Sequence, residues 1–272
     1  MKELFDLTGK VTVITGAGGV LCGTMAKSLA KIGAKVAVLD LNEAAAAKVV
    51  DDIKISKGVA VAIKCDVLDK DSLKAAKERV NAEFSKVDIL INGAGGNKKE
   101  ATTSPELSFF DLPTDAVRSV FDLNFVGTLL STQVFAKEMA ENNRGVILNV
   151  SSMSAFRPLT EVAAYSAAKA AVSNFTQWLA VHICRNYSKN IRVNAIAPGF
   201  FLTEQNRFLL TDEKTGELTP RGKSIIDHTP MARFGQPNDL IGTALWLISD
   251  ASRFVTGVVV PVDGGFSAFS GV

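Results

Sequence analysis

Residues 11–23 read Val11-Thr12-Val13-Ile14-Thr15-Gly16-Ala17-Gly18-Gly19-Val20-Leu21-Cys22-Gly23, and this stretch decides the fold. Its apolar, β-branched start predicts a strand, and the glycines that follow predict a tight turn into a helix. Glycine lets a backbone approach a pyrophosphate closely, and a helix N-terminus offers free N–H groups and a positive dipole. The turn therefore predicts a dinucleotide-phosphate site, formed by Gly16, Gly18, Gly19, Val20 and Leu21. A tight turn that holds no ligand is the alternative.

Short apolar runs and longer amphipathic segments alternate from this stretch to the end of the chain. Strands are predicted at residues 11–15, 35–40, 59–65, 89–92, 146–150, 191–197 and 258–262. Helices are predicted at residues 23–32, 44–57, 71–84, 114–141, 164–187 and 239–249. This alternation predicts an α/β fold, a Rossmann-type doubly wound parallel sheet of about seven strands with helices on both faces. Because no linker or repeat interrupts the pattern, we expect a single domain over residues 1–272.

Two polar stretches break this rhythm, residues 95–113 and residues 198–233, and each follows a predicted strand. In an open α/β sheet, ligands bind beyond the carboxyl ends of the strands, and long loops there are usually functional. We therefore expect both stretches on the ligand side, with residues 198–233 as the substrate loop.

Composition excludes several classes of function. The formal charge of +2 gives no indication of a nucleic-acid partner, and no apolar run is long enough to cross a membrane. The start of the chain lacks the apolar run of a secretory signal. Cys22, Cys65 and Cys184 are isolated thiols, and His182 and His228 are the only histidines. This pattern favours a cytoplasmic protein with no disulfide framework and no metal site.

Asp40 closes the second predicted strand, 24 residues after Gly16. A carboxylate at this place can accept hydrogen bonds from the adenosine ribose hydroxyls and would repel a 2′-phosphate. Leu41 and Asn42 offer no arginine to neutralise such a phosphate. The cofactor is therefore expected to be NAD(H) in preference to NADP(H). The alternative is that Asp40 caps the next helix, and the two roles are compatible.

Tyr165 and Lys169 lie four residues apart in a segment of strong helix formers, so they share one helix face. A free tyrosine has a pKa near 10, too high for proton transfer at neutral pH, and a nearby ammonium favours the phenolate. The spacing thus suits an acid/base pair. With 2 tyrosines and 30 basic residues, however, chance supplies such a spacing about once in five. A packed tyrosine beside a solvated lysine therefore remains the alternative.

Motifs in a fixed order decide between these alternatives. They are Thr15-Gly16 with its Gly-rich turn, Cys65-Asp66-Val67, Asn92-Gly93-Ala94-Gly95, Asp122-Leu123-Asn124, Ser151-Ser152, Tyr165-Ser166-Ala167-Ala168-Lys169, and Pro198-Gly199 followed by Thr203. In order and spacing, including the 13 residues from Ser152 to Tyr165, the sequence resembles the short-chain dehydrogenase/reductase superfamily over essentially its whole length. The resemblance implies an NAD(P)-dependent dehydrogenase or reductase that acts on CH–OH groups.

The resemblance also implies a catalytic set. Tyr165 would exchange a proton with the substrate oxygen, and Ser152 would hydrogen-bond the same oxygen. Lys169 would bind the nicotinamide ribose and lower the pKa of Tyr165. Asn124 would hold a water that relays protons to Lys169. Further cofactor contacts are implied for Asp66, Val67, Asn92, Ala94, Gly95, Tyr165, Lys169, Pro198, Gly199 and Thr203. For Asn92 the resemblance also leaves the alternative that it supports the sheet rather than touching the ligand.

Three residues depart from the pattern of the resembling enzymes. Val20 and Cys22 stand where the second and third glycines of the usual turn occur, and Gly93 replaces the second asparagine of the usual Asn-Asn-Ala-Gly. Gly18, Gly19 and Gly23 offer backbone freedom at shifted positions.

A narrower resemblance concerns the substrate. The segments Gly18 to Gly23, Ile91 to Asn97, Ser152 to Phe156, Phe200 to Arg207 and Asp263 to Val272 look like the D-mannonate oxidoreductase (fructuronate reductase) branch. This implies a sugar-acid substrate and a step of hexuronate breakdown. Such a substrate needs a cation for its carboxylate and polar groups for its hydroxyls. The candidates on the predicted ligand side are Asn97, Arg157, Gln205 and Arg207, with Arg157 first because it follows Ser152 by five residues.

Other functions remain open. A gluconate 5-dehydrogenase, or another polyol or 3-ketoacyl reductase, would use the same scaffold. A non-catalytic NAD-binding regulatory module is a more remote alternative. The helices predicted at residues 114–141 and 164–187 are apolar along much of their length. Resembling enzymes pair these helices between subunits, which implies a homodimer or homotetramer.

Overall fold

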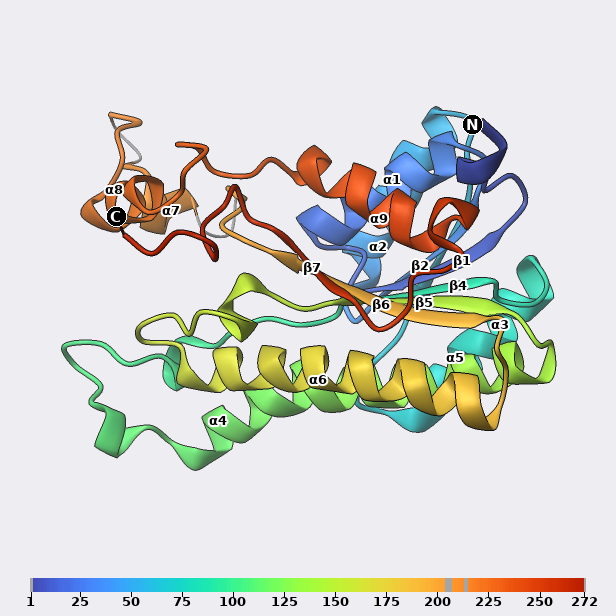
Figure 1. Cartoon of the computed structure of the whole chain (residues 1–272), viewed down its shortest axis with the longest axis horizontal. Helices are drawn as coiled ribbons and strands as arrows, with labels where there is room; N and C mark the ends of the chain where they lie inside the picture. Colours follow the sequence, from blue (N-terminus) through green and yellow to red (C-terminus); the bar gives the residue numbers. More distant parts are fainter. Residues whose placement is uncertain (1, 204–206, 213–214, 272) are drawn as a thin grey trace.

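A computed structural model gives the architecture, and it describes residues 2–203, 207–212 and 215–271 (Figure 1). Seven strands form one sheet in the order β3-β2-β1-β4-β5-β6-β7, and every neighbouring pair is parallel. The strands are β1 Val11–Thr15, β2 Lys35–Asp40, β3 Val59–Lys64, β4 Ile89–Asn92, β5 Gly145–Val150, β6 Ile191–Pro198 and β7 Val259–Val262. The predicted fold class is confirmed.

Helices cover both faces of this sheet (Figure 1). On one face lie α1 Val20–Lys31, α2 Glu43–Ile55 and α9 Ile241–Ile248. On the other face lie α3 Lys70–Glu83, α5 Gly127–Glu141 and α6 Ala163–Asn186. Two apolar cores result because every strand of a parallel sheet buries both of its faces. Ile14 contributes to the first core and Val13 to the second, and both are fully buried.

The long helix predicted over residues 114–141 differs in the structure. It consists of α4 Thr114–Phe121, a π-helical turn at Asp122–Val126, and α5. A π-turn holds one extra residue per turn, which hydropathy patterns do not reveal, and such turns are frequent at functional sites.

The predicted substrate loop contains two helices that the sequence pattern missed, α7 Arg207–Leu210 and α8 Pro220–Asp227. Thr219 caps α8 by accepting a hydrogen bond from the backbone N–H of Gly222 at 3.1 Å, and Pro220 occupies the first helical position. The pair Thr219-Pro220 was therefore an available start signal.

Among the described residues, no helix combines the length and the apolarity needed to cross a bilayer. The same residues gather no group of three or more His, Cys, Asp or Glu side chains that would suit a metal ion.

Candidate active site

A cavity of about 420 Å³ opens where the carboxyl ends of β1, β4, β5 and β6 meet. The predicted site residues that line it are Gly16, Gly19, Val20, Leu21, Gly95, Asn97, Ser152, Tyr165, Lys169, Pro198, Gly199 and Thr203. It is also lined by residues that received no role from the sequence, namely Cys22, Gly93, Gly96, Val150, Ser151, Phe200 and Phe201. Except for Cys22, which lies in α1, these residues stand at or shortly after the carboxyl ends of strands, and that position was the signal that could have identified them.

The Gly-rich turn forms one wall of this cavity. Gly16 has a φ of +66°, and a Cβ there would lie 2.7 Å from the Cα of Ala94, so only glycine fits. Gly19 precedes α1, and its N-cap position supplies no side-chain hydrogen bond to the first turn. The first turn of α1, which borders the cavity, therefore has no side-chain cap on its N–H groups, and this fits a pyrophosphate.

Asp40 lies beside this turn rather than on the cavity wall. One carboxylate oxygen accepts a hydrogen bond from Gly18 N at 2.9 Å, and the other accepts one from Asn42 N at 2.9 Å. Asn42 caps α2 by accepting from Ala45 N at 3.1 Å. Asn42, not Asp40, therefore caps α2. The Asp40 carboxylate holds the Gly-rich turn against the end of β2.

Asp66 and Val67 follow β3 and do not line the cavity. An Asp66 carboxylate oxygen accepts from Leu68 N at 2.9 Å. Val67 is buried, and a Cβ on Gly127 would lie 2.8 Å from its side chain. The structure therefore packs Val67 closely against the start of α5.

Asn92 and Ala94 also lie behind the cavity wall. The Asn92 side chain donates to Thr132 Oγ1 at 3.0 Å and to Asn149 Oδ1 at 2.9 Å. It therefore points into the molecule and links β4, β5 and α5. Ala94 N donates to Thr15 Oγ1 at 3.2 Å, which fixes the segment after β4 against β1.

Asn124 lies fully buried in the π-helical turn. Its side-chain nitrogen donates to the carbonyl oxygens of Val120 and Gly96, each at 2.7 Å, and its oxygen accepts from Gly96 N at 3.2 Å. A Cβ on Gly95 would lie 2.6 Å from that oxygen and 3.1 Å from Lys169 Nζ. The glycines after β4 thus allow the backbone to lie close to Asn124 and Lys169 while it borders the cavity.

Helix α6 carries Tyr165 and Lys169 on one face, and Ser152, which follows the end of β5, lies beside them. The Lys169 ammonium donates to the Val150 carbonyl at 2.9 Å and lies 5.6 Å from the centroid of the Tyr165 ring. Lys169 and Ser152 are buried, and Tyr165 is half-buried. The three side chains therefore share one wall of the cavity, as their spacing predicts.

Burial controls the charge of this pair. It lowers the pKa of Lys169 to about 8. It raises the pKa of Tyr165 above its ordinary value, and a hydrogen bond with Ser152 lowers that pKa in part. The expected lowering of the Tyr165 pKa by Lys169 is not seen, because the desolvation of each group outweighs the effect of its neighbours.

The substrate candidates among the described residues differ in their relation to the cavity. Asn97 lines the cavity and donates to Thr102 Oγ1 at 2.8 Å. Arg157 is exposed and donates from Nε to the Ser267 carbonyl at 3.1 Å. Arg207 is exposed at the start of α7. Gln205 lies outside the described residues.

Residues 263–269 run beside this cavity. The two carboxylate oxygens of Asp263 accept hydrogen bonds from Gly265 N and Ser267 N, each at 2.9 Å. The Phe266 ring meets the edge of Phe200, a cavity residue, at a centroid distance of 5.2 Å. The C-terminal segment therefore packs against residues from two loops of the site.

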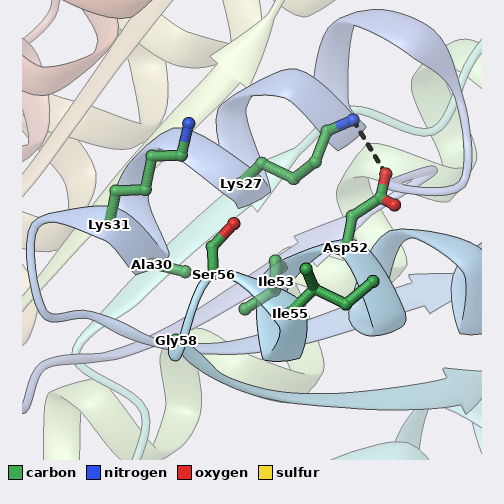
Figure 2. A pocket seen from close by; sticks show the side chains of 8 residues that line it. All are labelled: Lys27, Ala30, Lys31, Asp52, Ile53, Ile55, Ser56 and Gly58. Atoms are coloured by element: carbon green, nitrogen blue, oxygen red, sulfur yellow. Dashed lines mark hydrogen bonds and ion pairs between the residues drawn. The ribbon is translucent and has the colours of Figure 1, made fainter.

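A smaller pocket of about 250 Å³ lies between α1 and α2 (Figure 2). The ion pair between Lys27 and Asp52, at 3.2 Å, lies beside it. None of its lining residues borders the cavity at Tyr165, and it lies away from the carboxyl ends of the strands. We therefore assign the candidate active site to the larger cavity.

Comparisons with known proteins agree with this geometry. A family model described as Enoyl-(Acyl carrier protein) reductase matches residues 19–267. The uncharacterised oxidoreductase UxuB of Bacillus subtilis strain 168 is 50% identical over 276 residues, which cover 98% of both chains. The 7alpha-hydroxysteroid dehydrogenase of Escherichia coli K12 is 36% identical over 259 residues, 95% of this chain and 94% of that protein. A solved structure from Haemophilus influenza, provisionally described as a D-mannonate oxidoreductase and holding NAD, has a TM-score of 0.93 at 50% identity, covering 98% of each chain.

The fold and the cavity thus define a dinucleotide-dependent oxidoreductase, and the family match covers most of the chain. The chain belongs to the short-chain dehydrogenase/reductase superfamily. It is an NAD(P)-dependent dehydrogenase or reductase that acts on CH–OH groups.

Proposed function

We propose that this enzyme interconverts D-mannonate and D-fructuronate with NAD(H). The observation that carries the proposal is the shared cavity wall of Ser152, Tyr165 and Lys169. The provisional description of the Haemophilus protein, half of whose residues are identical, supports the choice of substrate.

The bound dinucleotide would accept the hydride from the substrate carbon during oxidation. Tyr165 would take the hydroxyl proton, and Ser152 would hold the oxygen by a hydrogen bond. Lys169 and Asn124 would pass the proton on toward solvent, since Asn124 and Lys169 both lie against Gly95. Gly16, Gly19 and the first turn of α1 would hold the pyrophosphate. Further cofactor contacts are proposed for Leu21, Gly95, Pro198, Gly199 and Thr203.

We infer a preference for NAD(H) over NADP(H) from Asp40. Its carboxylate closes β2 beside Gly18, where the adenosine ribose of a bound dinucleotide would lie. The negative charge would repel a 2′-phosphate. Binding of NADH and NADPH to the wild type and to Asp40→Ser tests this. Equal affinities of the wild type for both cofactors would contradict the inference.

The substrate carboxylate is proposed to meet Arg157. A guanidinium has five N–H donors, so the hydrogen bond to Ser267 orients the group and leaves four more for a carboxylate. Arg207 is the second candidate, because its backbone N–H donates to the carbonyl of Thr203, a cavity residue, at 2.9 Å.

The test is an initial-rate panel of D-mannonate, D-fructuronate, gluconate, a 3-ketoacyl substrate and a 7-oxo steroid with NAD(H) and NADP(H). We expect the highest kcat/KM with mannonate and fructuronate. Arg157→Ala should raise KM for mannonate well above its effect on a neutral polyol, and Arg157→Lys should raise it less. Equal effects of Arg157→Ala on both substrates would reject the carboxylate role.

We also propose that the enzyme is a homodimer or homotetramer paired through α5 and α6. A groove of about 570 Å³ lies between these helices and is lined by Phe175, Trp178 and Tyr187 among others. Trp178 is 54% exposed, which is unusual for so large an apolar side chain on a free surface.

A further inference from the structure

Cys22 and Gly93 meet between the Gly-rich turn and the segment that follows β4. A Cβ atom placed on Gly93 would overlap the sulfur of Cys22, and it would lie 2.8 Å from the Thr15 carbonyl. Carbon and sulfur atoms cannot approach so closely, because favourable contacts begin near 3.5 Å. A side chain at position 93 is therefore incompatible with the sulfur at position 22.

This contact lies directly on the route from the cofactor turn to the proton-transfer residues. Gly93 to Gly96 pass between Cys22 on one side and Asn124 with Lys169 on the other. At the far end, the Asn124 amide forms two hydrogen bonds with Gly96, of 2.7 Å and 3.2 Å. A side chain added at Gly93 would therefore displace Gly95 and Gly96 toward Asn124 and Lys169.

The Cys22 thiol is a neutral spacer at this place. It is 5% exposed, and burial raises its pKa to about 12, although the charge of Lys169 opposes that rise. A thiolate is the reactive form of cysteine, so the protonated group acts here by its size.

We propose that Cys22 and Gly93 form a steric pair that sets the distance between the first turn of α1 and the segment 93–96, and so positions Asn124 and Lys169 for the cofactor. Cys22 is then a positioning residue. The inference rests on the dinucleotide site proposed above. It also links two departures, since the sulfur of Cys22 occupies the space that a Cβ at position 93 would need.

A double-mutant cycle tests the pair. Cys22→Ala removes the sulfur and places a residue compatible with helix α1 there, and Gly93→Ala adds the obstructing methyl group. We expect Gly93→Ala to raise the NADH dissociation constant about fivefold more in the wild type than in the Cys22→Ala background. The contact with Thr15 is common to both backgrounds and cancels.

The pH profile of kcat provides a readout that general destabilisation would not move. It should shift in Gly93→Ala and return to the wild-type profile in the double variant. Cys184→Ala, which removes a thiol near Ile191 instead, is the matched control and should leave the effect of Gly93→Ala unchanged.

Equal effects of Gly93→Ala in the two backgrounds would overturn the proposal. If Gly93→Ala alone does not fold, a folded double variant supports the pair, and an unfolded double variant overturns it. A wild type that fails to bind NADH contradicts the proposed cofactor site instead. In that case the same cycle, followed by thermal unfolding, still decides whether the two residues are coupled.

Discussion

Lys169 shows how a functional residue can oppose folding. Its ammonium is almost wholly buried, and the Val150 carbonyl at 2.9 Å is its only hydrogen-bond acceptor recorded among the described residues. Burying a charge without a counter-ion is costly, which is why its pKa falls to about 8. The site therefore contains a group that the fold alone would not select.

We predict that Lys169→Met abolishes turnover and stabilises the free protein by about 1–2 kcal/mol at pH 7. Each unit of pKa shift is about 1.4 kcal/mol, and loss of the hydrogen bond to Val150 offsets part of the gain. Below pH 8 the folded chain carries the full cost of the buried charge. From pH 8 toward the ordinary pKa of 10.5, the unfolded chain binds more protons, so the stability of the wild type rises with pH.

Urea unfolding of both proteins at pH 7 and pH 10 measures this effect. The advantage of the variant should shrink at pH 10, and a variant less stable than the wild type at both values would contradict the prediction.

Tyr165→Phe should lower kcat by a factor of about 10² to 10⁴, the usual contribution of an acid/base group, and leave NADH affinity unchanged. Tyr187 is the only other tyrosine and is 64% exposed, so Tyr187→Phe is the matched control for activity. Stopped-flow turnover and NADH fluorescence separate the two effects. Full activity in Tyr165→Phe would contradict the proton-transfer role of Tyr165.

At the scale of elements, the π-helical turn at Asp122–Val126 is where sequence and structure diverge most. Residues 114–141 consist largely of helix-compatible residues, so the pattern predicts one continuous helix. The interruption depends on distant partners, because Asn124 binds Gly96 from the segment after β4 as well as Val120 from its own helix. Contacts of that range are not visible in local sequence patterns.

Asn124→Leu should destabilise the fold by about 1–3 kcal/mol, because it leaves the buried carbonyls of Val120 and Gly96 without their shared donor. Thermal unfolding and urea unfolding measure the loss. Asn97→Ala is the control, since Asn97 is exposed and its bond is to Thr102 in the same loop. An unchanged midpoint in Asn124→Leu would show that these bonds do not hold the turn.

The other elements were predictable to different degrees. The seven strands match closely, with β3 ending at Lys64 rather than Cys65, because Val- and Ile-rich runs leave little choice. Of the predicted site, Ser152, Tyr165 and Lys169 meet as expected, since spacing along one helix and strand order determine their places. Asn92 was harder, because only the partners Thr132 and Asn149 show that its side chain points away from the cavity.

At the scale of the whole molecule, the groove between α5 and α6 presents exposed aromatic side chains. The stacked rings of Phe175 and Trp178, with centroids 6.1 Å apart, lead to His182, which lies 4.6 Å beyond Trp178. These aromatic side chains lie on the face of α6 that borders the groove. A second copy of the chain would cover them.

Trp178→Glu should therefore lower the oligomeric state by at least one step, because a charge would be buried in the apolar interface. Light scattering coupled to size-exclusion chromatography measures the mass. Ile55→Glu is the control, since Ile55 is 81% exposed on α2 and borders only the small pocket of Figure 2. A monomeric wild type, or an unchanged mass in Trp178→Glu, would reject this interface.

The packing of residues 263–269 has a practical consequence for protein engineering. Ser267 accepts a hydrogen bond from Arg157, and the Phe266 ring packs against Phe200, so residues 266 and 267 lie close to the proposed substrate site. The two ends of the chain lie on opposite sides of the molecule (Figure 1). We expect an affinity tag or fusion partner at the C-terminal side to lower activity with the proposed substrate more than one at the N-terminal side. Purification and immobilisation schemes should therefore use the N-terminal end.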